Sequence, residues 1–145
     1  RQIIIEFSHL IPKTDGGELR GRTTANSGSS YDSGTSDYEH ALYSSRVGTS
    51  DGVEKSTGGS FIFLSGAVGN AAGESGTSGE VIITNPGSSL RSHIFIRSMN
   101  QNSNGDLRGH DGYGWRVAAA AQDGFQMYFS NDNILSGTIR TYEVT

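Results

Sequence analysis

Four amide and carboxylate side chains in one segment have the spacing of a calcium-binding loop. Asn100, Asn102 and Asn104 alternate, Gly105 follows them, and Asp111 stands at the twelfth position of the segment. Calcium loops place oxygen ligands at positions 1, 3, 5 and 12 and glycine at position 6. Three of these four ligands are neutral amides, however, and calcium binds best where negative charge offsets its lost hydration. We therefore interpret the segment first as a hairpin loop and only second as a weak calcium candidate.

Aromatic residues beside polar ones form a second group with possible chemistry. Tyr31 precedes Asp32, and Tyr113 and Trp115 follow a run of Asp and Gly residues. Aromatic rings can stack on a sugar ring while carboxylates and amides bond its hydroxyls. We predict a glycan contact at Tyr31, Asp32, Tyr113 and Trp115. The alternative, which stays open at this point, is that these aromatic side chains anchor the core or a contact between subunits.

Catalytic motifs are missing from the sequence. Asp32, Asp37 and Glu39 are close in sequence, but glycosidases need two carboxyl groups at a set separation across a cleft. The four histidines share no metal-ligand spacing, and no G-x-S-x-G motif, phosphate loop or dinucleotide fingerprint occurs. The sequence therefore predicts a protein that is not an enzyme and that uses no cofactor.

Short strands separated by Gly, Ser, Asn and Asp clusters must position these residues. Period-two alternation and β-branched residues predict about eight to nine strands, with long Gly/Ser loops and no helical period. The expected strands are Gln2–Phe7, Glu18–Thr23, Tyr38–Ser44, Ser60–Leu64, Glu80–Thr84, His93–Ser98, Gly114–Ala120, Phe125–Ser130 and Thr138–Val144. This pattern predicts an all-β fold, an antiparallel β-sandwich of jelly-roll-like type.

The last twenty residues carry the clearest strand signal. Phe125, Met127 and Phe129 alternate with polar residues, and the polar tip Ser130–Asn133 follows them. Gly137 then opens a second run that is rich in β-branched and aromatic side chains. We expect these two strands to pair as a closing hairpin.

Length and composition set the remaining limits. The chain has 145 residues, 21 of them glycine, no cysteine and a net charge of −4. This length fits one sandwich domain over residues 1–145, and the absence of cysteine excludes disulfides and thiolate metal sites. The acidic balance predicts no nucleic-acid partner, and no apolar run reaches the roughly 20 residues of a membrane span. Because Arg1 leads directly into a strand, we expect this sequence to be the C-terminal part of a longer polypeptide.

Several segments resemble a known family in their order along the chain. They are Leu10–Thr23 (LIPKTDGGELRGRT), Ser27–Tyr38 (SGSSYDSGTSDY), Val68–Val81 (VGNAAGESGTSGEV) and the closing FSNDNILSGTIRTY. This ordered set resembles the C-terminal modules of tailed-bacteriophage virion proteins, which include tail-fibre, appendage and head-associated proteins. The closing TYEVT departs from the more apolar, glycine-containing end that we would expect of that family.

The resemblance implies a function without catalysis. It implies a virion structural protein, located in the virion, whose partners are other virion proteins and copies of itself, with a trimer favoured. We expect a tail-fibre or appendage module that contacts a host surface glycan or receptor. The alternative is a capsid decoration protein, a cement or head-fibre protein that binds the capsid surface.

Overall fold

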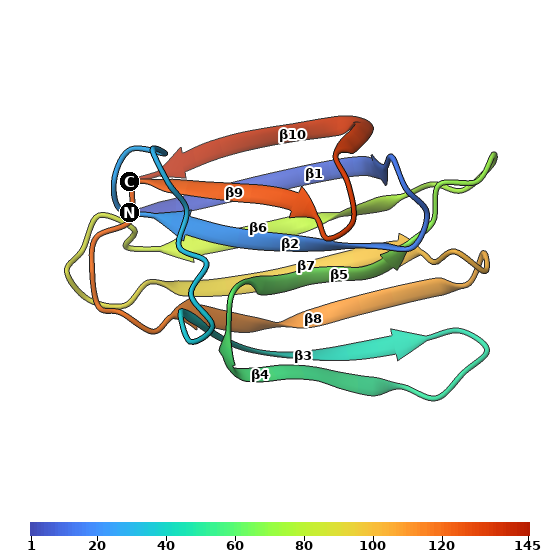
Figure 1. The fold of residues 1–145 in the computed structure, drawn as a ribbon, viewed down its shortest axis with the longest axis horizontal. Coiled ribbons are helices and arrows are strands. Elements are labelled where there is room, and N and C mark those ends of the chain that lie inside the picture. The colour runs from blue at the N-terminus through green and yellow to red at the C-terminus, as the bar shows by residue number, and fades with distance from the viewer.

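The protein folds into ten antiparallel β-strands in two sheets. The structure is a computed structural model that describes residues 1–145. Figure 1 shows the strands and their arrangement. Their bounds are β1 Gln2–Pro12, β2 Gly17–Thr24, β3 Tyr38–Arg46, β4 Gly52–Gly59, β5 Ile62–Val68, β6 Thr77–Thr84, β7 His93–Gln101, β8 Leu107–Arg116, β9 Gly124–Phe129 and β10 Ile134–Val144. The predicted all-β fold is confirmed.

The two sheets differ in size and form an antiparallel sandwich. The large sheet has seven strands in the order β10-β1-β6-β7-β8-β3-β4, and the small sheet has three in the order β5-β2-β9. The small sheet packs on one face of the large sheet, where β5 contacts β7, β8 and β3. In Figure 1 β9, β2 and β5 lie over the middle of the large sheet, whereas β10 and β4 extend beyond them. The jelly-roll-like arrangement stays a prediction.

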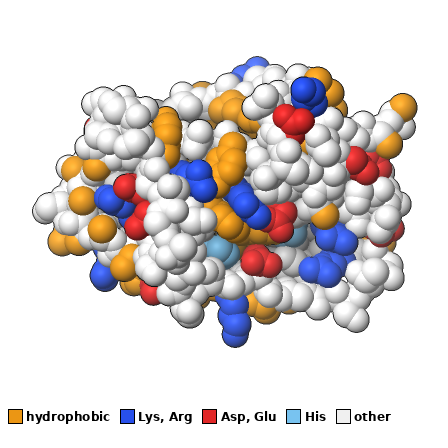
Figure 2. Space-filling view, viewed as in Figure 1, with side chains coloured by type: hydrophobic (Ala, Val, Ile, Leu, Met, Phe, Trp, Pro, Cys, Tyr) orange, Lys and Arg blue, Asp and Glu red, His pale blue; other side chains and the backbone are white.

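Strand alternation divides the large sheet into an inner face under the small sheet and an outer face. On β7, Ile94 and Ile96 are buried, whereas the alternating residues His93, Phe95 and Arg97 are exposed. One cluster of fifteen buried apolar residues lies between the sheets. Figure 2 views the molecule from the small-sheet side, where charged and hydrophobic side chains mix and histidines show near the centre. The outer face of the large sheet has no second layer within this chain.

The strand β4 was missed by the sequence analysis. Its sequence, GVEKSTGG, contains a single large apolar residue, Val53, and most of its residues are exposed. As an edge strand it pairs only with β3, from Tyr38 to Ser44. Backbone hydrogen bonds hold such a strand without any buried side-chain face, so no period-two pattern appears in its sequence.

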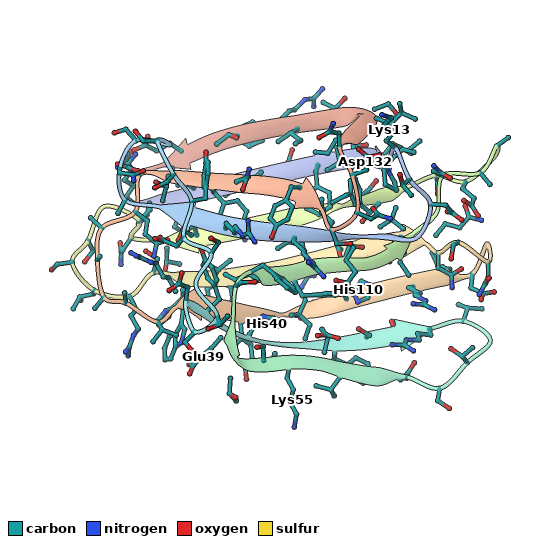
Figure 3. The ribbon with its side chains drawn as sticks, viewed as in Figure 1. Lys13, Glu39, His40, Lys55, His110 and Asp132 are labelled. Atoms are coloured by element: carbon teal, nitrogen blue, oxygen red, sulfur yellow. The ribbon has the colours of Figure 1, made fainter.

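The predicted closing hairpin is wrong. The strands β9 and β10 belong to different sheets, since β9 pairs with β2 and β10 pairs with β1. The connection from β9 to β10 crosses from the small sheet to the large one, and the turn from β1 to β2 crosses between the same two sheets. The two connections are hydrogen-bonded to each other. Lys13 N–H donates to Asn133 O at 3.0 Å, and Thr14 Oγ1 donates to Asp132 Oδ2 at 2.9 Å. Figure 3 shows Lys13 and Asp132 beside each other. Alternation therefore identified two strands correctly but not their partners.

The strand that carries Trp115 is displaced from its predicted position. We expected Gly114–Ala120, but β8 covers Leu107–Arg116 and ends before the alanines. Gly109, Gly112 and Gly114 gave this segment the composition of a turn. A Cβ atom at Gly112 would clash with the backbone oxygen of Ala41 on β3, so glycine there serves close strand approach rather than a turn.

Candidate functional site

Four aromatic side chains form a square patch on the outer face of the large sheet. His93 and Phe95 are on β7, and Tyr113 and Trp115 are on β8. The register places Phe95 opposite Tyr113 and His93 opposite Trp115. Because residues two apart on a strand share a face, all four rings lie on the same side of the sheet. The patch thus follows directly from alternation and register.

A groove of about 480 Å³ runs along this patch. Glu39 and Ala41 on β3 line it beside the rings, and Ser56 and Thr57 contribute from β4. Tyr113 is 63% exposed and Phe95 is 48% exposed, which is unusual for rings in the middle of a sheet. A volume of this size is within the range of small-ligand sites, about 300–1,000 Å³. The groove is therefore large enough for one or two sugar rings.

Gly114 brings the two sides of the groove together. A Cβ atom there would lie 2.7 Å from the backbone oxygen of Glu39 and 3.0 Å from Cβ of His40. Any larger residue would push β3 away from β8. Glu39 and His40 follow each other on β3, as Figure 3 shows, so Glu39 faces the groove while His40 faces the interior. Glycine thus sets the distance between Glu39 and Trp115.

Trp115 is held in place by its neighbours. Its Nε1–H donates to Glu39 Oε2 at 2.7 Å, and the His93 ring stacks on it with centroids 6.2 Å apart. The Arg91 guanidinium lies 5.1 Å from the ring centroid, while Arg91 Nε donates to Val117 O at 2.7 Å. Trp115 thus fixes one end of the groove. The open aromatic surface belongs to Tyr113 and Phe95.

The structure separates the other two predicted glycan residues from this groove. Tyr31 and Asp32 lie in the connection between β2 and β3. Arg116 Nε lies 2.9 Å from Asp32 Oδ2, an ion pair without hydrogen-bond alignment, and the Asp32 backbone oxygen accepts a bond from Tyr38 at 2.9 Å. Arg116 is on the inner side of β8, opposite to Tyr113 and Trp115. Asp32 therefore has a structural partner, and neither residue lines the groove.

Sequence reasoning missed three groove residues: Glu39, His93 and Phe95. Glu39 was considered only with nearby carboxylates, and His93 only among the four histidines that share no metal-ligand spacing. The alternation of His93–Arg97 contains a signal for Phe95, since a phenylalanine between two buried isoleucines must face outward. Their meeting with Tyr113 and Trp115 depends on strand pairing, which the sequence pattern does not contain.

The predicted calcium spacing does not form a calcium loop. The segment is the hairpin between β7 and β8, as the first interpretation held. Asn100 is buried and donates to Gly66 O at 2.8 Å, while Asn102 Oδ1 accepts the backbone N–H groups of Asn104 and Asp106. Asp111 is on the outer face, where Arg97 Nε donates to it at 3.0 Å. The side chains of Asn100 and Asp111 thus lie on opposite sides of the sheet, and no cluster of three His, Cys, Asp or Glu side chains occurs.

A buried hydrogen-bonded network on the inner face contains a serine, a histidine and an asparagine, which are residue types that hydrolytic sites use. Ser44 Oγ lies 2.7 Å from His110 Nδ1, and His110 Nε2 lies 3.1 Å from Asn100 Oδ1. All three are almost completely buried, so a substrate cannot reach the Ser44 hydroxyl. Burial lowers the pKa of His110 to about 4, so the ring is neutral at pH 7. The arrangement satisfies polar groups between the sheets and is not open to substrate.

A second hollow on the outer face, of about 430 Å³, is charged rather than aromatic. Glu6, Glu80, Arg97 and Arg140 line it. Register places Glu6 beside Arg140, and Arg97 lies 3.9 Å from Glu80 and 3.0 Å from Asp111. Arg97 and Glu80 thus already pair within the chain, and Phe7 is the one hydrophobic residue of the lining. The aromatic groove is therefore the better candidate for a ligand site.

Comparisons with protein-family models, with curated proteins and with solved structures give no match for this chain. The structure has no helix with the length and apolar character that a membrane crossing would require.

Proposed function

We propose that this chain is a non-catalytic module of a bacteriophage virion, of the tail-fibre or appendage type, that contacts a host surface glycan. The observation that carries the proposal is the groove on the large sheet, with the exposed rings of Tyr113 and Phe95 beside the Glu39 carboxylate. Rings next to acceptors are the combination that sugar recognition uses. The resemblance of the ordered segments to phage virion modules gives the biological setting.

The mechanism is weak recognition repeated over several copies. A sugar ring stacks on Tyr113 and Phe95, and its hydroxyls donate to Glu39 or bond to Thr57 at the rim. One shallow site of this kind binds weakly. A homo-oligomer, with the trimer favoured, raises the overall affinity because linked sites engage a polymeric surface together.

Capsid decoration is the second candidate, and one observation favours it. A row of apolar residues crosses the outer face from β8 to β10, through Tyr113, Phe95, Ile82, Ile4 and Tyr142. Tyr113, Phe95 and Tyr142 are exposed and Ile82 and Ile4 are half-buried, and a continuous apolar band of this kind is typical of a surface that another protein covers. Attachment to a capsid subunit, or to a second copy of this chain, would cover the band.

A glycan array probed with the assembled oligomer tests the first proposal. We expect binding to surface polysaccharides of a bacterial host, weaker binding with Tyr113→Ala, and no loss with Tyr128→Ala on the small sheet. Silence across host polysaccharides would favour decoration, which a virion image would reveal as stoichiometric copies on the capsid. A fall in polysaccharide viscosity during incubation would contradict the claim that the module lacks catalysis.

A further inference from the structure

We infer that the groove selects a glycan that carries a cationic group, such as a free amine or a quaternary ammonium. The inference rests on the proposed function, because it names the ligand class of the same groove. Two observations carry it: the single charged residue that lines the groove, and the arginine side chains that cover other aromatic rings of this chain.

Glu39 carries the only formal charge among the ten residues that line the groove. Its Oε2 accepts the Trp115 hydrogen bond, whereas Oε1 has no partner within the chain. Half of the carboxylate is therefore free to pair with a ligand. A free carboxylate in an aromatic groove attracts cations and repels acidic sugars.

Arginines of this chain already cover three other rings. The Arg20 guanidinium lies 3.8 Å from the Phe61 ring centroid, and that of Arg22 lies 4.7 Å from the Tyr128 centroid. Figure 2 shows Lys or Arg side chains against hydrophobic ones at the centre of this small-sheet face. Arg91 covers Trp115 in the same way, at 5.1 Å. The ring faces of these residues thus receive their cations from within the protein.

No cation of this chain covers Tyr113 or Phe95, although both rings are exposed and line the same groove as Glu39. Ring faces carry negative potential and bind ammonium groups, best where a carboxylate is close. Arg91 occupies the Trp115 end, so the ligand's cation is placed between Glu39 and Tyr113. Lys55 is in register with Ala41 on the edge strand but is not among the residues that line the groove, and in Figure 3 its side chain extends outward from β4.

Fluorescence of Trp115 provides a direct test, because it is the only tryptophan of the chain. The probes are choline and its neutral isostere 3,3-dimethyl-1-butanol, which differ in charge but hardly in shape. We expect choline to change the Trp115 emission with an affinity about tenfold higher than that of the isostere. Glu39→Gln, which keeps an oxygen for Trp115 Nε1, should remove this preference, and Lys55→Ala, a charge change outside the groove, should leave it nearly unchanged.

Two sugar probes separate this inference from the proposed function. Chitosan oligosaccharides carry free amines, and chitin oligosaccharides carry acetylated ones on the same backbone. Binding of chitosan but not of chitin supports the inference. Equal binding of both, still lost with Tyr113→Ala, overturns the cation inference and leaves the glycan proposal standing. If no glycan on the array binds, both the cation inference and the glycan proposal are overturned. Binding to phosphatidylcholine vesicles but not to chitosan overturns the inference in favour of a membrane ligand.

Discussion

The two faces of the large sheet use the same strands for different purposes. On β7, Ile94 and Ile96 are buried against the small sheet, whereas Phe95 between them is 48% exposed. On β8, His110 lies in the interior and Tyr113 lies open on the other side. Ile94 and His110 are thus packed or hydrogen-bonded inside, whereas no side chain of this chain covers the outer-face rings of Phe95 and Tyr113. The difference indicates that stability comes mainly from the inner face, and the proposed function assigns ligand contact to the outer face.

The largest expected effect is on the inner face. Ile94→Ala removes a side chain that is fully buried between the sheets, and such truncations cost about 2–5 kcal/mol of unfolding free energy. The matched change one residue away, Phe95→Ala, should cost far less, because its ring is half exposed. Urea unfolding with both variants measures the difference. Equal losses would remove the distinction between the faces.

Acid should weaken the inner face through its buried histidines. Burial lowers the pKa of His110 to about 4 and also lowers the pKa of His40. The unfolded chain therefore binds a proton near pH 6.5 that the folded chain accepts only near pH 4. The contribution of neutral His110 to the free energy of unfolding is complete above pH 6.5. It falls by about 3 kcal/mol in total as the pH decreases to 4.

Thermal or urea unfolding between pH 7 and pH 4 measures this loss. His110→Gln retains hydrogen-bonding groups but no titration in this range, so its stability should vary less with pH than that of the wild type. A wild-type profile as flat as that of the variant would show that His110 is not buried as described.

Tyr38 tests the polar part of the interior. Its ring is completely buried, its hydroxyl accepts the Thr23 N–H at 2.8 Å, and it donates to the Asp32 backbone oxygen at 2.9 Å. Tyr38→Phe keeps the ring but leaves both backbone groups without a partner. We expect a loss of about 1–3 kcal/mol in urea unfolding. A loss near zero would indicate that water replaces the hydroxyl.

The smallest expected effect on stability is at the groove. Tyr113→Ala should change the unfolding free energy by no more than about 0.5 kcal/mol, because the ring is exposed. The same change should weaken binding of an array-identified glycan by about 0.5–1.5 kcal/mol per site, as expected for the loss of one aromatic contact. Calorimetric titration measures the affinity, and Tyr128→Ala on the small sheet is the control. If Tyr113→Ala strongly lowered the unfolding free energy but left glycan affinity unchanged, the assignment of the two faces would be wrong.

The sequence predicted strands well where one side of the strand is buried. Alternation identified β7 and β9, and the β-branched run identified β10. It failed for β4, which buries no continuous face, and for the pairing of β9 with β10, because alternation indicates a face but names no partner. Three glycines in β8 indicated a turn, although they permit close contact between strands.

The candidate site was predictable only in part, for the same reason. Tyr113 and Trp115 are two residues apart, so any strand through them places both on one face. Their grouping with Phe95, His93 and Glu39 required the register of three strands. Tyr31 and Asp32 were included because they are adjacent aromatic and acidic residues, but the connection between β2 and β3 places them away from the groove.

Amide chemical-shift mapping of the assembled protein tests the central claim most directly. The titrant is a fragment of the host polysaccharide that the array identifies. We predict shifts at Glu39, Phe95, Tyr113 and Trp115 on the outer face, with the strands of the small sheet unchanged. Shifts confined to the small sheet or to the Tyr31–Asp32 connection would contradict the account, because they would place the ligand on a surface other than the groove.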